Sequence, residues 1–79
     1  MDIKEGGWFE FKDDQEIAGR LNPGEKKNAE YVDKNGIGPF KAVKLREQRL
    51  GIKVVHYINQ GGQHTSVAIW RIKSIEAPF

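Results

Sequence analysis

At 79 residues, the chain is long enough for one small domain and too short for two. It contains no cysteine, which excludes disulfide bonds and cysteine-ligated metal sites and suits a reducing compartment. Its longest apolar run falls short of the roughly 20 residues that a membrane-spanning helix needs, and its first residues lack the layout of a secretion signal. We therefore expect a single cytoplasmic domain, residues 1–79, that does not associate with a membrane.

The formal net charge of +2 is unevenly distributed along the chain. Residues 1–39 carry 6 Lys and Arg against 9 Asp and Glu, a net charge of −3, whereas residues 40–79 carry 7 against 2, a net charge of +5. A basic half suits an acidic protein surface or a nucleic acid as partner. A small soluble domain that keeps its charges on the solvent side gives the same pattern.

The first predicted element is a short strand over residues 8–12, with two phenylalanines on one side and Trp8 on the other. Asp13 and Glu16 then have the spacing of a capping box, which predicts a turn of helix over residues 15–21. The Asn-Pro-Gly sequence that follows ends this helix.

The middle of the chain gives weaker signals. Residues 25–28 are charged and are expected to form an exposed loop, and residues 29–32 are compatible with a strand. Residues 33–39 are rich in turn formers. A clearer strand is predicted over residues 40–46, where the side chains alternate.

The strongest local signal is a hairpin within residues 51–75. Two alternating runs, residues 52–58 and 65–69, flank a Gly-Gly pair that suits a tight turn. Two loops are compatible with the pattern, one over residues 59–62 and one over Gly61-Gly62 alone, and both keep the same side chains together. The predicted buried face consists of Ile52, Val54, His56 and Ile58, whereas Tyr57 lies on the opposite, mixed face.

After the hairpin the alternation breaks, which predicts a tight turn near residues 70–72 and a last strand through Ile75. Five short strands separated by a long polar excursion and then by tight turns resemble an SH3-like barrel. The segments GPFKAV and AIWRIKSI are similar to those of small phage-encoded barrels of this type. The resemblance implies an all-β, five-stranded barrel with a helical turn in its first long loop. It implies no activity, because such barrels host many unrelated functions.

Three residues are candidates for contact with a protein partner: Trp8, Tyr57 and Lys53. Tryptophan and tyrosine supply large apolar area with a polar group, which makes them good interface anchors. Either aromatic could instead pack within the domain. Trp70, at the break in the alternation, is expected to belong to the core.

A nucleic acid is the alternative partner. The residues that would contact it are the basic side chains of the second half: Lys44, Arg46, Arg49, Lys53 and Arg71. Lysine and arginine bind phosphates with release of counterions, and arginine adds paired hydrogen bonds. The cluster is unspecific, because exposed loops of soluble proteins are commonly charged.

The two histidines, His56 and His64, do not make a convincing catalytic or metal site. Without cysteine, a metal would need both histidines and carboxylates that no spacing brings together. A small ribonuclease with a histidine acid and base is the third function considered, but the hairpin with a loop over residues 59–62 points the two rings to opposite faces. No glycine-rich loop precedes a helix, so a nucleotide site is not predicted.

We therefore expect a binding module without enzymatic activity and without a cofactor. Its most favoured partner is a protein with an acidic surface, as for a phage-type accessory protein that docks on a host protein. Nucleic-acid binding through the basic half is the alternative. The oligomeric state stays open, because an uncovered edge strand can pair with a second copy.

Overall fold

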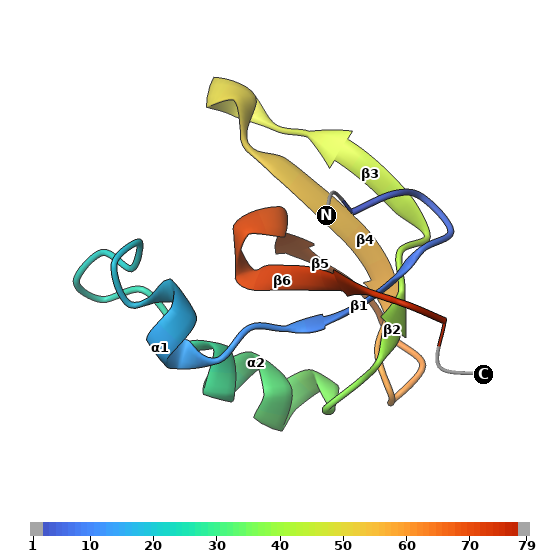
Figure 1. Cartoon of the computed structure of the whole chain (residues 1–79), viewed down its shortest axis with the longest axis horizontal. Coiled ribbons are helices and arrows are strands. Elements are labelled where there is room, and N and C mark those ends of the chain that lie inside the picture. Colours follow the sequence, from blue (N-terminus) through green and yellow to red (C-terminus); the bar gives the residue numbers. More distant parts are fainter. Residues whose placement is uncertain (1–2, 78–79) are drawn as a thin grey trace.

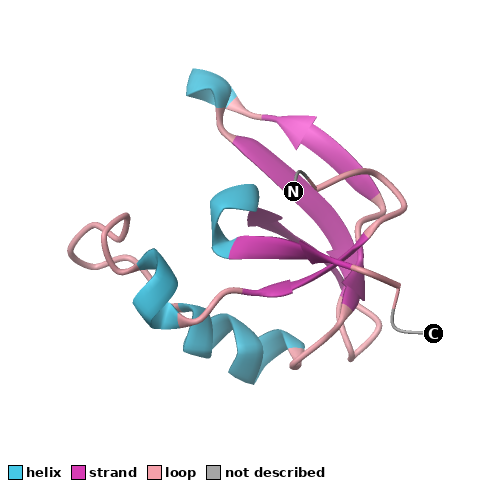
Figure 2. Ribbon diagram, in the orientation of Figure 1, coloured by secondary structure: helices cyan, strands magenta, loops and turns pink. Residues whose placement is uncertain are grey.

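The described residues fold into two small antiparallel sheets around one core, with their two α-helices gathered on one side (Figures 1 and 2). The computed structural model describes residues 3–77. The elements are β1 (Trp8–Phe11), α1 (Asp14–Ile17), α2 (Asn28–Asn35), β2 (Phe40–Lys41), β3 (Lys44–Glu47), η1 (Arg49–Gly51), β4 (Lys53–Ile58), β5 (His64–Ala68), η2 (Ile69–Arg71) and β6 (Ile72–Ile75). The prediction of a mostly β domain is confirmed. Within residues 3–77, no helix is long and apolar enough to cross a membrane.

The six strands of the described chain form two three-stranded sheets, ordered β2-β1-β6 and β3-β4-β5, that are not joined into one closed barrel. The chain passes from the first sheet to the second between Ala42 and Val43. The N–H of Ala42 donates to the carbonyl of Gly7 at 2.8 Å, whereas the N–H of Val43 donates to the carbonyl of His56 at 2.9 Å. The single strand predicted over residues 40–46 is therefore divided between two sheets.

The core is built from aromatic side chains of both sheets. Phe9 and Tyr57 are completely buried, and their rings meet edge to face with centroids 5.2 Å apart. Phe40 packs against the same tyrosine with ring centroids 4.9 Å apart. Aromatic pairs of this kind stabilise a core beyond the area that they bury. In a domain of this size, these few rings supply much of the apolar burial.

The hairpin of β4 and β5 is confirmed, but its predicted buried face is only partly right, because Val54 is buried as predicted whereas Ile52 and Ile58 are not. Ile58 pairs with His64 and Val55 with Val67, so the loop is five residues long and the register differs by one residue from both predicted registers. A shift of one residue exchanges the two faces of a strand. Val55 and Tyr57 therefore point into the core, whereas Ile52 and Ile58 keep 43% and 46% of their surface exposed.

Asn59 is the physical reason for the five-residue loop. Its Oδ1 accepts hydrogen bonds from the N–H groups of Gly61 at 3.0 Å and Gln63 at 2.9 Å. Its Nδ2 donates to Oδ1 of Asn35 at 3.1 Å, which ties the loop to the end of α2. An asparagine that bonds to the backbone just after it is a common way to fix a turn.

The prediction of a strand over residues 29–32 is wrong, because this segment belongs to α2. The helix turns Asn28, Tyr31, Val32 and Asn35 towards the sheets at the i, i+3, i+4, i+7 spacing of one helix face. The two asparagines on that face are buried. Since half of the stripe is polar, a search for apolar periodicity could not find it.

The helical turn predicted from the capping box is present as α1 and is shorter than predicted. Oε1 of Glu16 accepts a hydrogen bond from the N–H of Asp13 at 3.1 Å, as the capping box requires. The chain then leaves the helix after Ile17, which is buried.

The N-terminal turn lies over the start of β3. Oε1 of Glu5 accepts a hydrogen bond from the N–H of Leu45 at 3.0 Å, on the side of β3 that faces away from β4. The N–H of Gly6 donates to the carbonyl of Ala42 at 2.7 Å. The first residues thus cover part of an open sheet edge.

Candidate functional site

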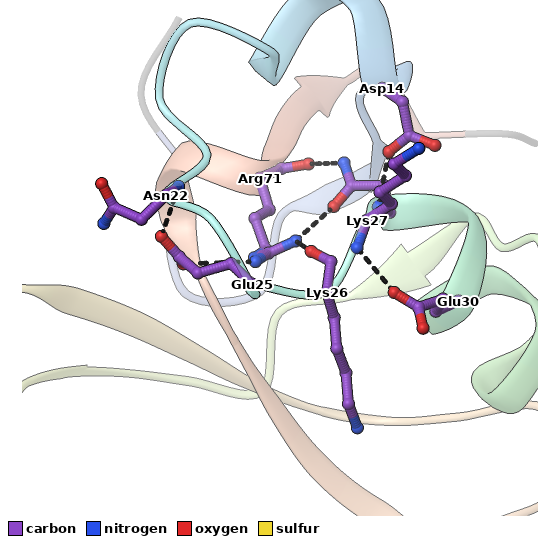
Figure 3. Close-up of polar contacts among 8 residues, drawn as sticks. Asp14, Asn22, Glu25, Lys26, Lys27, Glu30 and Arg71 are labelled. Carbon is purple, nitrogen blue, oxygen red and sulfur yellow. Dashed lines mark hydrogen bonds and ion pairs between the residues drawn. The ribbon is translucent and has the colours of Figure 1, made fainter.

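Arg71 fastens the long loop between β1 and β2 to the sheets (Figure 3). Only 5% of its surface is exposed. Its Nη1 donates to the carbonyl of Lys26 at 2.7 Å and to Oδ1 of Asn28 at 3.1 Å, and its Nη2 lies 3.6 Å from Oε2 of Glu25. A buried charge needs such a set of partners, because an unpaired one is costly in the interior.

Asn28 completes this cluster from the first turn of α2. Its Nδ2 donates to the carbonyl of Lys12 at 2.8 Å and to the carbonyl of Arg71 at 3.0 Å. Its backbone N–H donates to Oδ1 of Asp14 at 2.6 Å. The side chain of Asn28 therefore joins the residue after β1 to η2, and its backbone joins α2 to α1.

The prediction that Arg71 contacts nucleic acid is wrong, because its guanidinium is already occupied and covered. Besides its hydrogen bonds, the guanidinium carbon lies 4.8 Å from the ring centroid of Tyr31 and 4.5 Å from that of Trp70. Cations stack on aromatic faces in this way. Arg71 positions the loop and the Trp70 indole.

A groove of about 540 Å³ runs between the long loop, the tip of the β3–β4 hairpin and η2. Its floor includes Trp70, which is half-buried, and Ile72, which is buried. We call it the basic groove and define it by its lining residues: Ile3, Lys12, Arg20, Leu50, Gly51, Ile52, Lys53, Ile69, Trp70 and Ile72.

The basic groove carries charge of one sign. Lys12, Arg20 and Lys53 line it, and none of its described lining residues is acidic. The guanidinium carbon of Arg20 lies 5.2 Å from the centroid of the Trp70 ring. Cations around an apolar floor attract a carboxylate-bearing, partly apolar ligand.

The three residues predicted to contact a protein partner are not brought together. Lys53 is exposed and lines the basic groove. Trp8 is half-buried on β1, on the side away from the phenylalanines, and is not part of the groove. The prediction that Tyr57 is an anchor is wrong, because its side chain is completely buried in the core.

The five residues predicted to contact nucleic acid do not share one surface either. Lys44 and Arg46 are exposed on β3 and project from the same side of the sheet. Lys53 pairs with Glu47 on the neighbouring strand and projects from the other side of the same sheet. Arg71 is buried. The side chain of Arg49 lies outside the described residues.

The two histidines lie on the same face of the β4–β5 hairpin, contrary to the opposite orientation expected for a loop over residues 59–62. His56 is opposite Ser66 and His64 is opposite Ile58. In the part of the chain that the structure describes, no group of three or more metal-ligating side chains could hold a metal ion.

A second hollow of about 400 Å³ lies between β1, β6 and α2. Its lining mixes carboxylates with lysines, and Lys73 pairs there with Glu10 at 3.7 Å. Charges of both signs that neutralise each other make a poorer recognition surface than the uniform charge of the basic groove. The basic groove is therefore the stronger candidate site.

The pKa of the buried Tyr57 side chain differs from the ordinary value for tyrosine. Burial raises the pKa of its phenol from 10.0 to about 12, Thr65 opposes this, and the neighbouring Tyr31 adds to it. The Tyr57 hydroxyl makes no hydrogen bond of good geometry with the described residues, and burial is the largest influence on its pKa. The phenol of Tyr57 therefore stays neutral to a higher pH than the phenol of an exposed tyrosine does.

We expect Tyr57→Phe to be at least as stable as the wild type at neutral pH, because the change removes an unpaired buried hydroxyl. Since the folded pKa of about 12 exceeds the ordinary 10.0, stability is fully present below pH 10 and is lost as the pH rises towards 12. The wild type should lose about 2–3 kcal/mol relative to the variant over this interval. Urea unfolding of both proteins across this pH range measures the difference, and parallel curves would contradict it.

No protein-family model, curated protein or solved structure matches the chain. The site is therefore assigned from its geometry alone. Sequence reasoning missed Arg20, Leu50 and Trp70 as groove residues, because the three are distant in the chain and meet only in the fold. The exposure of Leu50 and Ile52 at the hairpin tip is likewise visible only in the folded molecule.

Proposed function

We propose that the protein is a binding module without enzymatic activity that docks on the acidic surface of a partner protein. The observation that carries this proposal is the basic groove, whose described lining residues include three cations, no acidic residue and an apolar floor. Interfaces of this composition gain affinity from desolvated aromatic and apolar groups and gain orientation from rim charges. Trp70 is the aromatic anchor and Lys53 the rim charge that face this partner.

We also propose that the fold is an open member of the SH3-like barrels, of the phage-encoded type. Several features support this: the long first excursion with its helices, the strand segment divided between two sheets, the hairpin of β4 and β5, and the short η2 before the last strand. In this assignment β2 and β3 are two parts of one barrel strand, which reconciles six strands with five. A phage-type accessory protein in the cytoplasm, docking on a host protein, fits this assignment.

Nucleic-acid binding is the weaker alternative. Of its predicted residues whose side chains the structure describes, two lie on one face of the β3–β4 sheet, Lys53 lies on the other face and Arg71 lies in the interior. Lys44 and Arg46 remain as exposed cations on one sheet face. Two cations neutralise few phosphates, and each phosphate contact contributes only one increment to a salt-dependent affinity.

The experiment is an affinity capture from a bacterial lysate, with and without nuclease treatment, followed by titration of the purified captured protein. We expect that a partner protein is still captured after nuclease treatment. It should bind the Lys53→Glu variant about tenfold more weakly than the wild type, because the change sets a like charge against an acidic partner. Lys44→Glu is the matched control and should bind as the wild type does. Capture that disappears with nuclease, together with a loss on Lys44→Glu, would establish the nucleic-acid alternative instead.

A further inference from the structure

Leu50 occupies the tip of the β3–β4 hairpin in an unusual state. Its side chain is 97% exposed, and its backbone has a φ of 66°. The hairpin tip projects beyond the body of the molecule at the top of Figure 1. Gly51, the next residue, also has a positive φ of 72°.

The positive φ of Leu50 belongs to the turn that closes the hairpin, since Leu50 and Gly51 together have the two positive φ angles that a tight hairpin turn needs. The choice of leucine for this position, in contrast, does not serve the fold. The left-handed region is unfavourable for a side chain larger than glycine, and asparagine tolerates it better than leucine does. An exposed leucine also gains nothing from apolar burial. Strained and exposed residues of this kind are kept where a function uses them.

We infer that Leu50 is the specificity-determining anchor of the interface and inserts into an apolar pocket of a folded partner, a pocket rimmed by carboxylates. This inference rests on the proposed function. The side chain of Leu50 makes almost no contact within its own molecule, so a partner must enclose it in order to bury it. Lys53 and Arg20 line the same groove as Leu50 and match an acidic rim.

A folded protein fits these features better than a lipid surface. Leu50 is the only apolar side chain near the tip that is almost fully exposed among the described groove residues, whereas Ile52 is 43% exposed and Ile69 is half-buried. Stable association with a lipid interface needs several apolar side chains in one plane. One projecting leucine can fill a single apolar pocket of a partner protein, as the central anchor residues of protein interfaces do.

Leu50→Asn separates this inference from a structural role, because the two expected effects have opposite signs. The thermal midpoint should rise by about 4 °C, because asparagine relieves the backbone strain. Affinity for the purified captured partner should fall about thirtyfold or more, as for a central anchor. Ile37→Asn is the matched control: Ile37 is 75% exposed but lies outside the basic groove, so this variant should bind as the wild type does.

A diazirine analogue of leucine at position 50 adds a direct probe. It should cross-link the purified partner within one apolar pocket, identified by mass spectrometry of the linked peptides. Cross-links scattered over the partner's surface would overturn the inference, as would a lower thermal midpoint for Leu50→Asn.

The remaining outcomes separate this inference from the proposed function. If Leu50→Asn binds normally while Lys53→Glu does not, the anchor is wrong and the basic groove stands. If both variants bind normally, or if the wild type captures no protein, both are overturned. Binding of the wild type to vesicles of phosphatidylcholine and phosphatidylserine, lost in Leu50→Asn, would assign the tip to a membrane and overturn the protein socket.

Discussion

Replacing Arg71 with alanine should lower the free energy of unfolding by about 3–4 kcal/mol, the range for breaking a buried charge cluster. The change leaves the carbonyl of Lys26 and Oδ1 of Asn28 without their donor, and it removes the cation stacked on Trp70. A domain of this size has roughly 5 kcal/mol of stability in total, so only about 1–2 kcal/mol should remain and the fraction of unfolded molecules should rise to several per cent. Chemical unfolding followed by tryptophan fluorescence measures the loss.

Arg71→Lys tests whether the shape of the guanidinium matters. Lysine keeps the charge but cannot bond to two partners in one plane or stack as a flat group, so it should restore about half of the lost stability. Arg46→Ala is the control, since Arg46 is exposed on β3, and it should change the stability by less than about 0.5 kcal/mol. Equal stability of Arg71→Ala and Arg46→Ala would contradict the anchoring role.

Replacing Asn59 with alanine should cost about 3 kcal/mol. Its side chain, 6% exposed, accepts two backbone hydrogen bonds within the loop and donates to Asn35 and Gln63. Loss of several buried hydrogen bonds at once leaves their partners unpaired, each at about 1 kcal/mol. Urea unfolding gives the loss, and amide hydrogen exchange of Gly61 and Gln63 should become faster because their acceptor is gone.

Gln48→Ala is the matched control for this change. Gln48 is an exposed amide residue in the turn of the other hairpin, and its replacement should leave the stability and the exchange of the β4–β5 loop unchanged. If Asn59→Ala behaved in the same way, backbone pairing alone would fix the five-residue loop.

Much of the strand pattern could be predicted from the sequence, because alternation and turn residues are local signals. The hairpin, the break near Trp70 and the last strand through Ile75 all follow from them. The prediction that Phe9 and Phe11 lie on one side of β1 is also confirmed, and both side chains are buried. Each of these features depends on residues that are neighbours in the chain.

The register and α2 could not be predicted, because both depend on tertiary hydrogen bonds. The pair of Asn59 and Asn35 joins residues 24 positions apart and sets a loop length that Gly61 and Gly62 leave open. Asn28 turns inwards because Lys12 and Arg71 offer it carbonyl oxygens. Buried asparagines carry no signal of their burial in a hydropathy pattern.

The site was predicted only in part, since a groove is a property of the assembled molecule. Lys53 was placed correctly on the surface, but the aromatic partner chosen for it, Tyr57, is inside. The choice followed from the face assignment of β4, in which the alternation put Tyr57 on the side away from the core. The aromatic residue that lines the groove together with Lys53 is Trp70.

The hydrogen bond from Leu45 to Glu5 has a consequence for how the protein behaves at high concentration. Fibrils grow when the free backbone amides of an edge strand accept a strand from the next molecule. A carboxylate already bound to the Leu45 amide closes that position to an incoming carbonyl and adds a negative charge that an approaching strand must displace. The N-terminal turn therefore hinders the addition of a strand from a second molecule along the edge of β3.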